Sequence, residues 1–150
     1  MDRANAITIS GNITSDPELR FTQGGKAMVS FSVAHGRRWK TANSDQWEER
    51  TSFIKCVAWG DFAEHIAESI QKGLRVMVCG YLEQQTWETD QGEKRSSFQI
   101  QISDMGPSLL WATASVNRIS KGGGGGKSAF PDPLAPPVVR DDFGPDEAPF

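Results

Sequence analysis

Apolar and polar residues alternate along several short stretches of this chain, which is the pattern of β-strands with one buried face. We predict five such strands, over residues 7–13, 29–33, 51–59, 74–87 and 96–105. Turn residues at 16–17 and 24–25 separate the first two strands, and residues 90–93 mark a hairpin turn before the last. The polar residues 40–49 predict a long loop.

One segment has the spacing of a helix instead. Apolar residues recur every four positions between residues 62 and 70, which predicts a short helix from about Asp61 to Lys72. The side chain of Asp61 is expected to cap its N-terminus, with Glu64 completing a capping box. Gly73 is expected to end the helix.

Five strands with one helix between the third and the fourth are the layout of an OB-fold, a five-stranded Greek-key barrel. We therefore predict a mainly β fold, with the barrel in a domain over residues 1–120. Residues 121–150 contain five consecutive glycines and six prolines but few apolar side chains. Such a segment cannot form a core, so we predict a disordered acidic tail, with a flexible linker over 121–145 and a tip over 146–150.

The distribution of charge separates these two parts. Residues 1–120 carry 13 Lys+Arg and 14 Asp+Glu, a net −1, whereas residues 121–150 carry 3 and 5, a net −2. A total of −3 argues against a simple basic nucleic-acid binder. We find no signal peptide and no apolar run long enough to cross a bilayer. Cys56 and Cys79 lie in apolar strands and are expected to be buried reduced thiols, so we expect a cytoplasmic protein with no membrane partner.

Large aromatic residues stand where the core does not need them. In the third strand, the even-numbered residues of 54–58 form a compact apolar face that suits the barrel interior. Phe53 and Trp59 then fall on the outside, with Lys55 between them. Exposed aromatic side chains beside a cation suit stacked bases with a phosphate alongside.

Two further tryptophans, Trp39 and Trp87, stand among polar and basic residues and are predicted to stack bases as well. Each aromatic residue taken alone is more often part of a core, and Trp47 stays ambiguous. Phosphate contacts are predicted at Arg20, Arg37, Arg38, Lys40, Lys55, Lys72, Lys94 and Arg95. A single Lys or Arg is more often a solvated surface residue.

Several blocks resemble the bacterial single-stranded DNA-binding (SSB) family in order and spacing, over about residues 5–113 and at the C-terminus. They include GNITSDPELR at 11–20, AWGDFAE at 58–64 and GEKR at 92–95. The resemblance implies a non-enzymatic, nucleoid-associated protein that binds single-stranded DNA, usually as a homotetramer. It places Trp39, Phe53, Trp59 and Trp87 where the family stacks bases, and Lys55 and Lys72 where it contacts phosphates.

The C-terminal tip also matches the family, at Asp146, Glu147, Pro149 and Phe150. By this resemblance, DNA replication, repair and recombination proteins bind the tip. Phe150 presents a ring and a carboxylate together, which suits an apolar pocket rimmed by Arg or Lys. From composition alone, a solvated tail without a partner is equally plausible.

Three features depart from the general family pattern. Asp61 and Gln85-Thr86 stand where many members carry basic residues, which predicts lower DNA affinity or a smaller salt dependence. Residues 106–113 resemble one branch in which an extra strand clamps neighbouring subunits. The short linker leaves open a cellular, phage or accessory copy.

The predicted fourth strand, residues 74–87, is apolar on both faces and needs cover on both. Two explanations stay open. Either a subunit interface supplies the second cover, or residues 106–113 of the same chain do.

Other functional classes have little support. His35 and His65 lie near no nucleophile pattern, and together with Cys56 and Cys79 they lack the spacing of a zinc site. We therefore expect no enzyme activity, cofactor or metal. An OB-fold that binds RNA, or an adaptor acting mainly through its tail, is the alternative.

Overall fold

The computed structural model describes residues 5–120. Its elements are β1 (Ala6–Ile13), β2 (Glu18–Phe21), β3 (Ala27–Lys40), β4 (Trp47–Trp59), α1 (Asp61–Ser69), β5 (Arg75–Glu88) and β6 (Lys94–Pro107). The chain divides into two units after Ser115, and the described residues of the second, 116–120, form no helix or strand. The predicted linker and tip, residues 121–150, lie outside the described residues.

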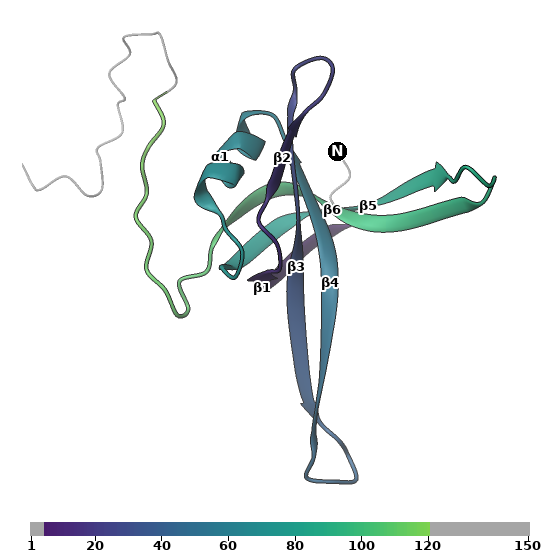
Figure 1. The fold of residues 1–150 in the computed structure, drawn as a ribbon. Coiled ribbons are helices and arrows are strands. Elements are labelled where there is room, and N and C mark those ends of the chain that lie inside the picture. Colours follow the sequence, from purple (N-terminus) through teal and green to yellow (C-terminus); the bar gives the residue numbers. More distant parts are fainter. Residues whose placement is uncertain (1–4, 121–150) are drawn as a thin grey trace, which may run out of the picture. The chain divides into compact units, whose positions relative to one another are not determined.

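Five strands close into a barrel (Figure 1). The order of neighbours is β1-β5-β6-β4-β3, and β1 pairs again with β3 to complete the ring. The β4–β6 pair is parallel and the other pairs are antiparallel. Since α1 connects the third and fourth barrel strands, the predicted OB-fold with one short helix is confirmed.

The core follows from the alternation in the sequence. All five barrel strands contribute side chains to the core, mostly from every second residue, and α1 adds two more. The core includes Ile13, Val29, Phe31, Val33, Cys56, Ala58, Ala63, Ile66, Val76, Val78, Ile100 and Ile102. Burial raises the pKa of the Cys56 thiol to about 12. Cys79 is only half-buried, which corrects the prediction that both thiols are buried, although both cysteines are free.

The strand β2 is missing from the predicted set. It pairs with the start of β3, where Glu18 lies opposite Ser30 and Phe21 opposite Ala27. All four of its residues are exposed. Its residues do alternate between polar and apolar, as Glu-Leu-Arg-Phe, but four residues between two turns are too few for this pattern to indicate a strand.

The long loop predicted over residues 40–49 is wrong. Strand β3 continues to Lys40 and β4 begins at Trp47, with the N–H of Thr41 donating to the Gln46 carbonyl at 3.1 Å. Beyond the barrel, β3 and β4 pair with each other, as do β5 and β6, and neither pair has another partner strand within residues 5–120. Figure 1 shows these two hairpins leaving the barrel as separate arms.

The helix ends also differ from the prediction. Gly60 is the N-cap, and no side chain caps the helix; with a φ of 71°, Gly60 turns the chain out of β4 one residue before Asp61. The helix stops at Ser69 because Ile70 is extended and buried in the core. Gly73, at φ 87°, instead donates its N–H to the Ile13 carbonyl at 2.8 Å. No helix within residues 5–120 is long and apolar enough to span a membrane.

The predicted clamp segment forms no strand after Pro107 within this single chain. Ser108 donates its N–H to the Arg75 carbonyl at 2.9 Å, and the Trp111 ring lies 5.0 Å from the Arg75 guanidinium. This leaves Met77, on the outward side of β5, 49% exposed. Cover of β5 by residues 5–120 is therefore incomplete.

Candidate nucleic-acid interface

Strand register places most of the predicted site on one face of the sheet, which we call the outer face. Residues directly opposite each other in neighbouring strands share a face, and every second residue along a strand repeats it. Phe53, Lys55 and Trp59 alternate along β4, and Lys55 lies opposite Gln99 of β6. Further along the β5–β6 pair, Trp87 lies opposite Arg95 on the same face.

The outer face exposes its aromatic rings. Phe53 is 71% exposed, Trp87 47% and Trp59 37%. Val57, between Lys55 and Trp59, is buried although it points outward, because it sits where β3, β4 and β6 run together. The prediction that Phe53 and Trp59 are exposed is therefore confirmed, because Cys56 and Ala58 of the same strand fill the interior.

The ring of Trp59 is held in place from two sides. The Lys26 ammonium lies 5.2 Å from its centroid, a cation–π contact. Its indole N–H donates to Gln101 Oε1 at 3.2 Å. A ring held in this way presents its remaining face to a ligand with less loss of conformational freedom.

A carboxylate lies in the middle of this face. Glu83 Oε2 accepts hydrogen bonds from the side-chain amides of Gln101 at 2.8 Å, Gln99 at 3.1 Å and Gln85 at 3.2 Å. The amides of Gln101 and then Gln99 are the main reasons that the pKa of Glu83 is lowered, with burial opposing them. Hydrogen bonds that favour the charged form are lost only as pH falls through this lowered pKa, so Glu83 is ionised at neutral pH.

Five of the eight predicted cations lie on the outer face by register: Arg20, Arg38, Lys40, Lys55 and Arg95. Three of them pair with nearby acids, Arg20 with Glu18, Lys40 with Asp45 and Arg95 with Glu93. Such exposed pairs contribute about 0–1 kcal/mol each, so a phosphate can replace the acid at little cost.

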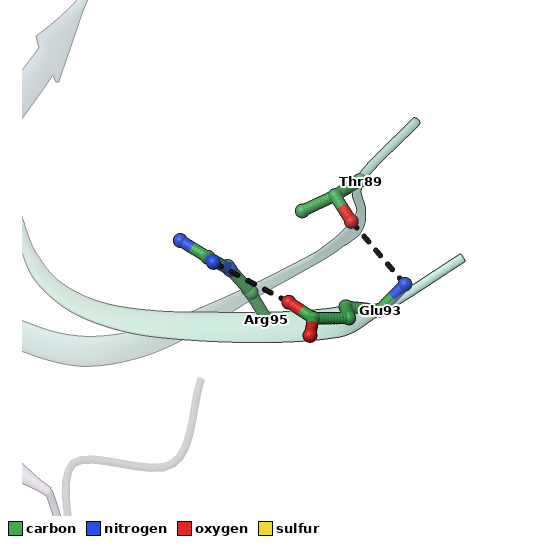
Figure 2. Close-up of polar contacts among 3 residues, drawn as sticks. All are labelled: Thr89, Glu93 and Arg95. Carbon is green, nitrogen blue, oxygen red and sulfur yellow. Dashed lines mark hydrogen bonds and ion pairs between the residues drawn. The ribbon is translucent and has the colours of Figure 1, made fainter. Parts of the chain in front are cut away.

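The tip of the β5–β6 arm holds one of these pairs (Figure 2). Thr89 Oγ1 accepts the Glu93 N–H at 3.2 Å, and Glu93 Oε2 lies 3.3 Å from Arg95. The turn thus fixes Glu93, and Glu93 in turn pairs with the guanidinium of Arg95, whose backbone lies opposite Trp87.

The other pleat face of the arms carries a second group. Arg37, Trp39 and Lys94 lie there rather than with Phe53 and Trp59. Arg37 lies directly opposite Arg50, and the Arg50 guanidinium is 6.0 Å from the centroid of the Trp39 ring. Arg37, Trp39 and Arg50 all line a hollow of about 590 Å³. Like charges directly opposite are unfavourable without an anion, so this hollow suits a phosphate beside a stacked base.

Lys72 lies on neither face. It follows α1 in the turn before β5, where its backbone N–H donates to Asp16 Oδ1 at 2.9 Å.

Within residues 5–120, four exposed aromatic residues are absent from the predicted site: Phe21, Trp47, Phe98 and Trp111. Two of them, Trp47 and Phe98, lie on the arms. Trp47 is 58% exposed on the outer face, opposite Lys40 and 5.2 Å from the Arg38 guanidinium. Continuing the alternation from Phe53 back to Trp47 would have found it. Phe98, 59% exposed, lies on the opposite face of β6 and continues the alternation of the core residues beyond the barrel.

Comparison with known proteins gives a consistent result. The sequence model described as "Single-strand binding protein family" matches residues 4–108. The single-stranded DNA-binding protein of Mycobacterium tuberculosis is 44% identical over 128 residues, 85% of this chain and 78% of the relative. That of Mycobacterium leprae is 47% identical over 119 residues, 79% and 71% of the two chains.

A solved structure titled "Plasmodium falciparum SSB complex with ssDNA" has the same fold. Its TM-score is 0.66 at 23% identity, and the match covers 72% of this chain and 97% of the other.

Proposed function

Since the chain belongs to the single-strand binding protein family, we propose that it binds and protects single-stranded DNA without strong sequence preference. Its relatives are named for binding single-stranded DNA, and the outer face has the chemistry for such binding. Exposed rings on a surface with cations between them fit unpaired bases and their phosphates. A duplex hides the faces of its bases and should bind poorly.

The exposed aromatic rings of the outer face are the observation that carries this proposal. Phe53, Trp59 and Trp87 come from β4 and β5 and share a face with Lys55 and Arg95. Stacking contributes roughly 1–3 kcal/mol per base and tolerates any base. Each phosphate contact releases counterions, so log K falls by about 0.7 per contact per log unit of salt.

Quenching of tryptophan fluorescence tests the proposal. Oligo-dT at low salt is expected to quench the emission, because Trp59 and Trp87 stack on bases. Competition with RNA and with duplex DNA of equal length should release little of the oligo-dT. Absence of quenching at low salt would overturn the stacking mechanism, and stronger competition by RNA would favour an RNA-binding role.

We propose that the C-terminal tip recruits DNA replication, repair and recombination proteins. The tip is acidic and ends on Phe150, and residues 121–150 hold a net charge of −2 against −1 for the rest of the chain. Deletion of residues 146–150 is expected to abolish capture of such partners while DNA affinity stays equal or rises. The control is a variant with Asp141 and Asp142 changed to Asn, and equal capture by the deleted chain would contradict the tip's role.

We propose that the protein is a homotetramer. Strand β1 pairs with β5 along Ala6–Asn12 but with β3 only at Asn12 and Ile13, so within residues 5–120 most of its other edge has no partner strand. Such an edge accepts a strand from another copy, and the exposed Met77 next to it adds apolar surface. Native mass spectrometry is expected to give the mass of four 16.5 kDa chains, and a monomer at micromolar concentration would contradict the assembly.

A further inference from the structure

Glu83 occupies an unusual place for a carboxylate, within the barrel section of the outer face. In register, Glu83 lies opposite Gln99, and Gln99 lies opposite Lys55 on its other side. Adjacent strands are about 4.8 Å apart, so the backbones of Glu83 and Lys55 are about 10 Å apart. Trp87 follows on the same face four residues along β5. A strand of DNA that stacks on Phe53, Trp59 and Trp87 must therefore pass close to this carboxylate.

The carboxylate keeps its negative charge there. Three glutamine amides stabilise it through Oε2, and none of the described ion pairs includes it. A phosphate at this point would meet a like charge across a short distance. The DNA must then cross Glu83 with a base or sugar rather than a phosphate.

The second carboxylate oxygen has capacity to accept a bond. All hydrogen bonds from the described residues to this carboxylate end on Oε2, so Oε1 takes none of them. We propose that Glu83 Oε1 accepts a hydrogen bond from the exocyclic amino group of a base, and so favours an amino-bearing base at this one position. This inference rests on the proposed binding of single-stranded DNA.

The chemistry of the bases sets the direction of the preference. Cytosine carries an amino group at N4 and adenine one at N6, and a glutamate is a suitable acceptor for the cytosine amino group. Thymine has the carbonyl oxygen O4 at the corresponding position, which a carboxylate repels. Cytosine is therefore favoured over thymine at the Glu83 position, while the stacking rings elsewhere accept either base.

The network also fixes the position of the acceptor. Gln101 donates from Nε2 to Glu83 and accepts at Oε1 from the Trp59 indole. The acceptor is therefore linked through one amide to a stacking ring. A base stacked on Trp59 and its neighbour at Glu83 would be read by one connected arrangement.

The test compares two oligomers of equal length, oligo-dC and oligo-dT, with the wild-type protein and with Glu83→Gln. Loss of the charge should strengthen binding of both, and dividing one dissociation constant by the other cancels that shared effect. The affinity for oligo-dC divided by the affinity for oligo-dT is expected to fall about fivefold in Glu83→Gln, because hydrogen bonds to a charged acceptor are about twice as strong as neutral ones. Glu88→Gln is the matched control, since it removes the same charge from the same strand on the opposite face.

A second measurement leaves the protein unchanged. An oligo-dC with dimethylated N4 atoms has no amino hydrogen. Relative to oligo-dT, the wild-type protein should therefore bind the dimethylated oligomer less tightly than it binds unmodified oligo-dC. Equal ratios in wild type and Glu83→Gln, or undiminished binding of the dimethylated oligomer, would overturn the inference. Failure of the wild type to bind any of these oligomers would instead contradict the proposed function itself.

Discussion

Replacing Phe53 and Trp59 together by alanine is expected to weaken binding of oligo-dT about a hundredfold or more at fixed salt. Each base stack contributes roughly 1–3 kcal/mol, and about 1.4 kcal/mol corresponds to a tenfold change in affinity. Both side chains are exposed on the outer face, so their removal leaves the core intact. Fluorescence anisotropy with a labelled oligomer gives the dissociation constants.

Phe98→Ala is the matched control for this experiment. Phe98 is also an exposed aromatic residue, 59% exposed, but it lies on the opposite face of β6. Its removal should change affinity by less than about threefold, within the spread of exposed substitutions. If Phe98→Ala weakened binding as much as the double variant, the assignment of the stacking surface to the outer face would be wrong. Unchanged thermal unfolding would show that all variants remain folded.

Gly80→Ala is expected to destabilise the barrel by about 3 kcal/mol, the upper end for an overpacked site. A Cβ at this position would collide with the Gln101 carbonyl oxygen and lie 2.9 Å from Ile100 Cγ2. Gly80 also sits where the pairing of β5 with β6 shifts register, so neither backbone can move aside without breaking that pair. Thermal denaturation should show a fall in Tm on the order of 10 °C.

Gly36→Ala tests whether the effect comes from this collision. Gly36 also lies in a strand, but the nearest atom to its added Cβ would be Glu49 Oε1, 3.7 Å away. Its substitution should change stability by no more than about 0.5 kcal/mol. Both variants must be compared at one protein concentration, because assembly makes Tm depend on concentration. Equal Tm values for the two variants would refute the close approach of β5 to β6 at Gly80.

The sequence predicts the barrel well because a barrel strand has one buried face. Val29, Phe31 and Val33 alternate with polar residues, and the same rule assigns Phe53 and Trp59 to the outside. This alternation need not arise in a strand whose two faces are both exposed to water. Residues 47–50 are all exposed, so the arm that they form looks like a loop in the sequence.

The hydrogen bonds around Glu83 cannot be predicted from the local sequence pattern, for a different reason. Gln85 lies two residues away on the same strand, but Gln99 and Gln101 reach Glu83 through the register of β5 with β6, which no run of residues encodes by itself. The two groups of arginine and tryptophan on opposite faces of the β3–β4 arm also depend on where the strand ends. A prediction that starts β4 at residue 51 has no register for Trp39 or Trp47.

The two arms affect the net free energy of nucleic-acid binding. Beyond the barrel, each arm is a ribbon of two strands, with no third strand beside it in the part of the chain that the structure describes. Such ribbons are marginally stable alone. Amide hydrogens in the arms should therefore exchange with solvent far faster than those of the barrel, through local opening that leaves the core closed. A nucleic acid bound along the arms would slow this exchange selectively, so part of the intrinsic stacking energy is spent on ordering the ribbons.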